Sequence, residues 1–435
     1  MGTDLMAAAT YALPATAILA AYLHLRGRTQ RRSRATRLES EEAGLVEPPS
    51  LHPVIDVARC IGCASCVHAC PEGNVLGLIG TKAELVNPTH CIGHGACREA
   101  CPTRAISLVF GTARRGVDIP LVKPNFETNV PGIFIAGELG GMGLIRNAVE
   151  QGRQAIESVS RHRGGGQGRD LDVVIVGAGP AGISASLGAI ERGLRYITVE
   201  QDSLGGTVAH FPRGKLVMTA PVKLPLVGPV RLTETTKEYL LEFWQGVIDR
   251  TGVAIRFQER VERIECGTDG FEVVTTSARY RPRAILLCIG RRGTPRTLDV
   301  PGEETNKVVY RLVDPEQYRG KRVLVVGGGD SALEAATSIA DLPGSSVTLS
   351  YRGDNFSRAK QKNRAKVEQA VSARRMDLLL GSKVLRIEPD AVHLSAGDRS
   401  IAIGNDAVIV CAGGVLPTGF LKEIGIEVET KYGTA

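Results

Sequence analysis

The chain has 435 residues, 43% of them hydrophobic, and a formal net charge of +7, so it is long enough for about three domains and a sizeable core. Six of the positive charges lie in one short arginine run, at Arg26, Arg28, Arg31, Arg32, Arg34 and Arg37. The rest of the chain is nearly neutral, which argues against a nucleic-acid-binding protein. Seven of the ten cysteines lie between Cys60 and Cys101, which indicates metal binding in a reducing compartment rather than a secreted disulfide framework.

Residues 1–27 are predicted to form a transmembrane anchor. The stretch from Leu5 to Leu25 has no charge apart from a possible one at His24, and as a helix it would be roughly 31 Å long, close to the ~30 Å core of a bilayer. The arginine run follows it, so the positive-inside rule places the catalytic domains in the cytoplasm. A cleaved signal peptide is the alternative, although its positive charge should precede the apolar stretch. Residues 28–51 are expected to form a solvated linker of basic and acidic residues.

Two runs of metal-ligating residues follow the linker. The first reads Cys60-x-x-Cys63-x-x-Cys66-x-x-x-Cys70-Pro71, and the second reads Cys91-x-x-His94-x-x-Cys97-x-x-x-Cys101-Pro102. This spacing is typical of bacterial iron–sulfur proteins, in which the fourth cysteine of each run points to the other cluster. Residues 52–112 therefore resemble the two-cluster bacterial ferredoxin domain. The resemblance implies one [4Fe-4S] cluster on Cys60, Cys63, Cys66 and Cys101, and a second cluster on Cys91, Cys97 and Cys70.

His94 stands where the ferredoxin pattern expects a cysteine. Three interpretations are open. His94 ligates a second [4Fe-4S] cluster, or the iron that a cysteine at this position would bind is lost and a [3Fe-4S] cluster remains. In the third, His94 is a solvated loop residue beside an atypical cluster. Gly93 and Gly95 flank it, so the backbone could bring the imidazole close. A neutral nitrogen ligand should raise the reduction potential relative to a thiolate, and we expect two clusters of different potential.

The stretch from Asp172 to Glu200 predicts a dinucleotide site. It has the order strand, glycine turn, helix, strand and acid, which together are specific for a βαβ unit that binds a pyrophosphate at the helix N-terminus. The turn and first helical residues are Gly177, Gly179, Pro180, Ala181 and Gly182. Glu200 ends the next strand, where a carboxylate can bind ribose hydroxyls.

Residues 113–160 resemble the closing flavin segment of the thioredoxin-reductase family, through Thr128–Glu138 and the helix that follows. The resemblance implies that Gly137 and Glu138 hold the ribitol–phosphate part of FAD and that the helix carrying Asn147 points its N-terminus at the flavin. In that family the segment ends the chain, whereas here it precedes the glycine turn, joined by a flexible bridge at residues 161–170. We predict a circularly permuted FAD domain, which is tolerated when the old ends lie close together. A duplicated fragment packed elsewhere is the alternative.

The remaining flavin contacts are also implied by this resemblance. They fall in the FAD-binding domain, residues 171–298, at Gly205, Gly206, Thr207, Val261 and Gly290. Residues 414–435 are expected to return to this domain.

A second glycine loop opens the predicted NAD(P)-binding domain, residues 299–413. Its candidate residues are Gly327, Gly329, Asp330 and Ser331, and Ala332 still allows close packing in place of a third glycine. The resemblance implies that Arg352 meets the 2′-phosphate of NADP, and Arg358, just beyond it, could substitute for a second arginine. Gly353 replaces a second arginine common in NADPH-using relatives, so the preference for NADPH over NADH stays open.

The thioredoxin-reductase-like resemblance covers about residues 115–435 and is nearest to the bacillithiol-disulfide-reductase-like branch. Thioredoxin reductases carry a Cys-x-x-Cys pair before the second glycine loop, but residues 294–322 contain no cysteine, so electrons cannot pass to a protein dithiol by exchange. The expected fold is α/β, with two Rossmann-like dinucleotide-binding domains, a small α+β dicluster ferredoxin domain and an N-terminal transmembrane helix. A homodimer is implied by the resemblance.

These features predict a membrane-anchored oxidoreductase that passes electrons between NAD(P)H, FAD and iron–sulfur clusters, to or from a redox partner protein or the quinone pool. No side chain is expected to act as a covalent catalyst, because the cofactors carry out the chemistry. The alternatives are a flavin-dependent reductase of a small disulfide and a redox sensor.

Overall fold

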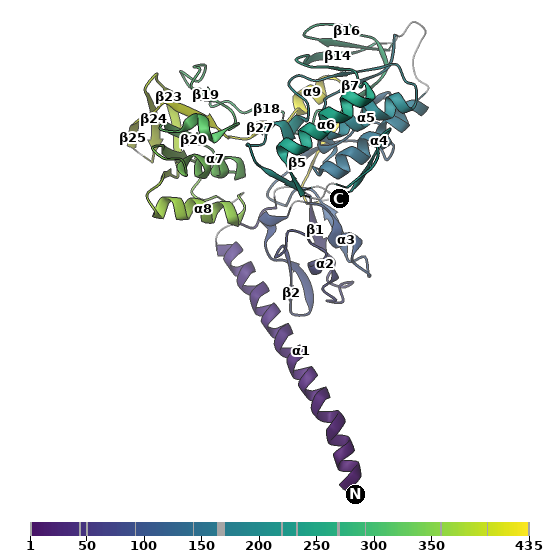
Figure 1. Ribbon diagram of the computed structural model, residues 1–435, viewed down its shortest axis with the longest axis vertical. Helices are drawn as coiled ribbons and strands as arrows, with labels where there is room; N and C mark the ends of the chain where they lie inside the picture. The colour runs from purple at the N-terminus through teal and green to yellow at the C-terminus, as the bar shows by residue number, and fades with distance from the viewer. Residues whose placement is uncertain are drawn as a thin grey trace. The chain divides into compact units, whose positions relative to one another are not determined.

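The computed structural model describes residues 2–42, 45–48, 51–91, 93–141, 143–162, 170–218, 221–231, 234–267, 270–291, 293–356, 359–397 and 399–433, with the backbone alone for residues 2–15, 216, 218 and 294. The chain divides into two compact units (Figure 1). Unit 1 comprises Met1–Gly116 with Tyr432–Ala435, and unit 2 comprises Val117–Lys431.

Unit 1 combines one long helix with two short helices and two antiparallel strand pairs. Its elements are α1 (Gly2–Glu42), β1 (His52–Ile55), α2 (Ser65–His68), β2 (Leu76–Ile79), β3 (Lys82–Leu85), α3 (Ala96–Glu99) and β4 (Ile106–Val109). Strand β1 pairs with β4, and β2 pairs with β3. The core between them mixes aliphatic side chains such as Val75 and Ile106 with buried cysteines, so the predicted metal ligands are built into the hydrophobic core of this unit.

Helix α1 contradicts the predicted membrane anchor. Among the residues that the structure describes, no helix combines the length and the apolar character needed to cross a bilayer. The stretch from Leu5 to Leu25 is rich in alanine and also contains threonine and proline, so it gathers less apolar surface than a leucine-rich span would. The prediction of a single-pass transmembrane anchor is therefore wrong.

The solvated linker predicted for residues 28–51 is helical over much of its length. Helix α1 continues to Glu42, and Arg37 forms ion pairs with Glu41, one turn further on, and with Glu84 on β3. The Ser33 side chain is buried and lies against Gly77 of β2. Arginine, leucine and glutamate are good helix formers, which favours a helix over this stretch. The contact between Ser33 and Gly77 packs the helix against the rest of unit 1.

A five-stranded parallel sheet forms the first half of unit 2. Its order is β13 (Ile255–Arg256), β8 (Tyr196–Val199), β7 (Leu171–Val176), β17 (Pro282–Leu287) and β6 (Ile133–Ile135). The run from Val173 to Ile175 is fully buried, as expected for a parallel strand covered on both faces. Helices α4 (Ile145–Arg161) and α5 (Pro180–Glu191) pack closely against each other.

Strand β6 comes before β7 in the chain, but it forms an edge of this sheet beside β17, the last of the five strands in the sequence. Its residues Ile133–Ile135 pair in parallel with Ile285–Leu287 of β17. On α4, a Cβ atom at Gly152 would overlap the backbone of Ala181 on α5, so the two helices touch through their main chains. The segment predicted to close the flavin domain therefore completes the sheet from an earlier position in the chain, and it is not a duplicated fragment packed elsewhere.

A second five-stranded parallel sheet forms the other half of unit 2. Its order is β19 (Val308–Val309), β26 (Ala407–Val410), β20 (Arg322–Val326), β21 (Ser346–Ser350) and β22 (Asp377–Leu379), with helices α7 (Asp330–Ala340) and α8 (Gln361–Ser372). The two sheets confirm the predicted α/β fold class.

Short strands and two further helices complete unit 2. The antiparallel pairs are β5 (Val117–Pro120) with β28 (Val428–Lys431), β9 (Leu216–Met218) with β12 (Glu234–Thr236), β10 (Val222–Leu224) with β11 (Gly228–Val230), and β18 (Thr294–Pro295) with β27 (Gly414–Val415). The three-stranded sheets are β14 (Val261–Gly267), β15 (Gly270–Thr275) and β16 (Arg279–Tyr280), and β23 (Ser382–Ile387), β24 (Ala391–Ala396) and β25 (Arg399–Gly404). The helices are α6 (Lys237–Thr251) and α9 (Thr418–Glu423).

Candidate functional site

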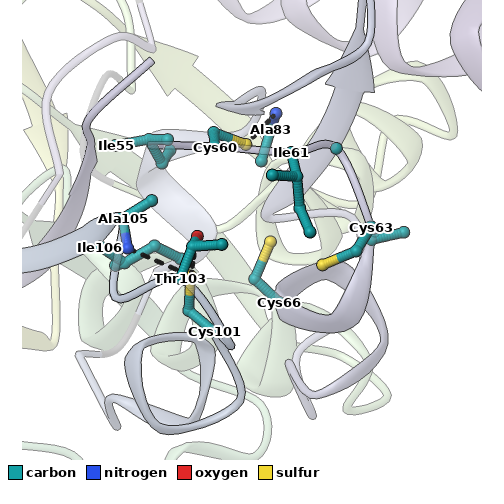
Figure 2. Close-up of a pocket in the computed structure, with 12 residues that line it drawn as sticks. Ile55, Cys60, Ile61, Cys63, Cys66, Ala83, Cys101, Thr103, Ala105 and Ile106 are labelled. Atoms are coloured by element: carbon teal, nitrogen blue, oxygen red, sulfur yellow. Dashed lines mark hydrogen bonds between the residues drawn. The ribbon is translucent and has the colours of Figure 1, made fainter. Parts of the chain in front are cut away.

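The first cysteine set lines one cavity in unit 1. Cys60, Cys63, Cys66 and Cys101 surround it, and Figure 2 shows their sulfur atoms directed toward a common centre. Two of the sulfurs accept backbone hydrogen bonds: Ala83 N–H donates to Cys60 at 3.4 Å, and Ala105 N–H donates to Cys101 at 3.3 Å. This is the set that the ferredoxin resemblance assigns to one cluster.

The second set lines a separate cavity of the same unit. Cys70, Cys91, His94 and Cys97 surround it, together with apolar side chains such as Val75 and Leu108. The fourth cysteine of each run therefore lies with the other run, as the pattern predicts.

The donor set suits iron–sulfur clusters. Burial raises the pKa of the Cys66 and Cys97 thiols to about 11, so these thiols would lose protons as iron binds. Within the described ranges, no three His, Cys, Asp or Glu side chains lie close enough to share one metal ion. The ligands are instead spread around cavities, as thiolates are when each binds a different iron of a cluster.

The first glycine loop follows β7 in unit 2. Gly177 has φ +105°, and a Cβ atom there would lie 2.6 Å from the Cys288 carbonyl oxygen on the neighbouring chain segment. A Cβ atom at Gly182 would overlap the Gly177 carbonyl oxygen. Helix α5 begins at Pro180, directly after Gly179. Loop, strand and helix thus pack as closely as a pyrophosphate-binding turn requires.

Glu200 lies at this loop, directly after β8. One carboxylate oxygen accepts the Ala178 N–H at 2.7 Å, and the other accepts the Asp202 N–H at 2.9 Å. The side chain is only 7% exposed, and burial raises the pKa of its carboxyl group. Its oxygens retain further lone pairs, which can accept ribose hydroxyls.

The other candidate flavin contacts surround the same loop or lie on the strands beside it. Gly205 N–H donates to the Ala178 carbonyl oxygen at 3.0 Å, so the turn carrying Gly205, Gly206 and Thr207 touches the glycine loop. Gly290 follows β17, and Val261 is partly buried at the start of β14, at an irregularity in its pairing with β15. Strands β7 and β17 bring Gly177 and Gly290 to the same end of the sheet.

The closing segment also reaches the glycine loop. Gly137 N–H donates to Gln151 Oε1 at 2.8 Å, and a Cβ atom at Gly137 would lie 3.1 Å from Ala181 Cβ. Glu138 is half-buried after β6, and Asn147 lies in the first turn of α4. The structure thus brings the predicted residues of both segments together at one end of the sheet.

Arg291 is a residue of this region that sequence reasoning missed. Its guanidinium donates to the Asp118 carbonyl oxygen at 2.8 Å. Burial lowers its pKa, while the nearby Glu138 and Asp118 carboxylates oppose that effect. In the sequence, only its position directly after Gly290 could have pointed to it. Its burial depends on β5, which lies far away in the chain.

The second glycine loop follows β20. A Cβ atom at Gly327 would lie 3.0 Å from Ala332 Cβ, so loop and helix pack closely although the third glycine is absent. Gly329 precedes α7, and Ser331 is exposed in its first turn. Asp330 Oδ1 accepts the Lys360 N–H at 2.8 Å and the Asn363 amide at 2.7 Å. The Asp330 carboxylate is therefore engaged by the start of α8, a contact that the sequence did not predict.

Arg352 is exposed directly after β21 and Tyr351. The Tyr351 ring stacks on Phe356 with centroids 5.6 Å apart and fills the space beside Gly328. The other predicted phosphate contact, Arg358, lies outside the described residues.

Residues 174–434 match the family of pyridine nucleotide-disulphide oxidoreductases, and residues 52–102 match a 4Fe-4S dicluster domain. A ferredoxin–NADP reductase of Symbiobacterium thermophilum is 30% identical over 275 residues, which cover 60% of this chain and 78% of that protein. The bacilliredoxin reductase Bdr of Bacillus subtilis is 25% identical over 266 residues, which cover 60% of this chain and 82% of that protein.

A solved structure shares the fold of part of this chain. The bacillithiol disulfide reductase Bdr (YpdA) from Bacillus cereus superimposes with a TM-score of 0.52 at 24% identity and covers 59% of this chain and 81% of that chain. The likeness at this identity shows the fold alone.

Proposed function

Because the chain belongs to the pyridine nucleotide-disulphide oxidoreductase family and carries a 4Fe-4S dicluster domain, we propose that this oxidoreductase takes electrons from NADPH through FAD and delivers them through its own clusters to a redox partner protein. The supporting observation is the sorting of the metal-ligating side chains into two cavities on a chain that also carries two glycine loops of the dinucleotide-binding type. The relatives named ferredoxin–NADP reductase favour a one-electron carrier as partner.

The chain's residues bind and orient the cofactors. The loop from Gly177 to Gly182 and the start of α5 receive the FAD pyrophosphate, and Glu200 receives ribose hydroxyls. Gly137 and Glu138 serve the ribitol–phosphate part. When bound, FAD accepts an electron pair as hydride and can release the electrons singly.

The nucleotide site favours NADPH in this proposal. The loop from Gly327 to Ser331 receives the pyrophosphate, and Arg352 stands where a 2′-phosphate would need a cation. We expect a homodimer, as the family resemblance implies; sedimentation of the purified protein measures this directly.

The absence of a Cys-x-x-Cys pair also favours the clusters as the acceptors of electrons from the flavin. No cysteine occurs between Thr294 and Arg322. The buried Cys288 is a poor substitute, because burial raises the pKa of its thiol and the thiolate is the reactive form. The cysteines around the two cavities are instead placed to bind clusters.

Anaerobic stopped-flow spectroscopy tests the proposal. NADPH should bleach the flavin absorbance first and then the cluster absorbance, faster than NADH does. Reduction of an added ferredoxin should require the clusters. Slow reduction that never reaches the clusters would contradict the proposal.

A second candidate function is direct reduction of a small disulfide by the flavin. The similarity to a bacilliredoxin reductase supports it. In that case NADPH oxidation would depend on the added disulfide, and the cluster absorbance would stay unchanged during turnover.

A further inference from the structure

His94 repeats the backbone position of Cys63 in the other cysteine run. Each residue occupies the second ligand position of its run and precedes a residue with positive φ, 64° at Ala64 and 81° at Gly95. A short helix follows in both cases, α2 or α3. The two positions therefore present a cysteine and a histidine to their cavities from the same local backbone.

The side chain at each position forms a hydrogen bond with the residue two positions further on. At the first position, the Cys63 thiol donates to Ser65 Oγ at 3.4 Å. At the second, Ala96 N–H donates a hydrogen bond of 3.1 Å to His94 Nδ1. A ring nitrogen of the histidine thus accepts a backbone N–H, whereas the sulfur in the other run is paired with a hydroxyl group.

A backbone N–H that donates to the side chain affects iron binding differently for sulfur and for nitrogen. A thiolate has several lone pairs, so it can accept an N–H and bind iron together. A neutral imidazole has one acceptor nitrogen, and its other nitrogen carries the proton. Because Nδ1 of His94 accepts the Ala96 N–H, the proton lies on Nε2, which is buried. Metal-binding histidines normally donate their second ring N–H to an acceptor, whereas Nδ1 here faces a donor.

We propose that the second cavity holds a [3Fe-4S] cluster on Cys70, Cys91 and Cys97, with His94 beside it as a residue that does not bind iron. Three thiolates line this cavity, which provides one ligand for each iron. The inference rests on the proposed clusters and specifies the composition of the second one.

Iron analysis and EPR of the full-length protein, purified anaerobically and oxidised mildly, test this inference. The oxidised protein should show one [3Fe-4S] signal per chain and contain one iron fewer than two four-iron clusters require. After incubation with excess ferrous iron and a thiol reductant, mild reoxidation should restore the same signal, because no side chain is available to bind a fourth iron. Histidine labelled with ¹⁵N should produce no coupling characteristic of a nitrogen bound to iron.

Two substitutions at His94 and one control separate the possibilities. His94→Ala should leave the iron content and the [3Fe-4S] signal unchanged, whereas His94→Cys should gain one iron per chain on incubation with ferrous iron and lose the signal. The matched control, Cys63→Ala, should add a second [3Fe-4S] signal from the first cavity. A wild-type protein with two four-iron clusters, one of which loses an iron in His94→Ala, would overturn the inference. Loss of all iron and sulfide from the wild-type protein would instead overturn the proposed function.

Discussion

Glu200 and Arg291 illustrate, at the scale of single residues, what the sequence could and could not predict around the first glycine loop. Glu200 could be predicted because an acid about 20 residues after a glycine loop has a known task. Its two backbone hydrogen bonds could not, since they depend on the turn after β8. Arg291 was missed for a similar reason: its burial arises from β5, which is remote in the sequence.

We predict that Glu200→Gln weakens FAD binding. The substitution places an amide NH₂ group where one carboxylate oxygen now accepts a buried backbone N–H, and an unsatisfied buried donor costs about 1–3 kcal/mol. The FAD dissociation constant should rise by about tenfold or more, measured by flavin fluorescence after gel filtration. Glu191→Gln, which changes an exposed carboxylate at the end of α5, is the matched control, and equal FAD retention in both variants would contradict the assignment.

At the scale of elements, local spacing predicted more than composition did. The glycine turns and cysteine runs lie largely in loops, as their spacing predicted, because a few residues at fixed spacing determine a loop. The place of β6 in the flavin sheet followed from the family resemblance, and the pairing of β6 with β17 confirms it. The apolar content of Leu5–Leu25 was misleading, because an alanine-rich helix can continue into a charged one without crossing a membrane.

The contact between α4 and α5 predicts a specific weakness. Gly152→Ala places a Cβ atom against the Ala181 backbone, which cannot move without displacing α5, and overpacking of this kind costs about 1–3 kcal/mol. Thermal unfolding should shift to lower temperature and FAD content should fall. Gly246→Ala on α6 is the control, because that position has open space and alanine favours the helix by up to about 1 kcal/mol. Equal stability of the two variants would show that α4 does not pack on α5.

The second sheet predicts a pH-dependent effect. Asp406 accepts Arg322 N–H at 2.8 Å and pairs with the Arg322 guanidinium at 2.7 Å, which ties the start of β20 to β26. These interactions lower the pKa of Asp406 from 3.8 to about 2. Since the folded-state pKa is the lower one, the stabilisation is present above about pH 4 and disappears as the pH falls through about 2.

Asp406→Asn should therefore unfold more easily than the wild-type protein at pH 6, and the difference should shrink as the pH falls below 4. Chemical denaturation across this range measures it. Asp377→Asn, at an exposed position on β22, should show no such trend. A difference for Asp406→Asn that stays constant from pH 6 to acid would contradict the role of its charge.

The molecule as a whole combines a pyridine nucleotide-disulphide oxidoreductase domain with a 4Fe-4S dicluster domain on one chain. The sequence alone was enough to predict these parts, because each carries its own motif. It was not enough to show which side chains already have partners, such as Asp330 with α8 and His94 with Ala96. Those contacts depend on three-dimensional packing, and they now limit what each residue can do.

Anaerobic titration of the purified full-length chain with NADPH, followed by visible spectroscopy and EPR, tests the central claim most directly. The account predicts stoichiometric FAD, iron and sulfide in one polypeptide, with the flavin bleached first and reduced cluster signals appearing afterwards. Protein that contains stoichiometric iron and sulfide but no flavin, or whose clusters stay oxidised while NADPH fully reduces the flavin, would contradict it.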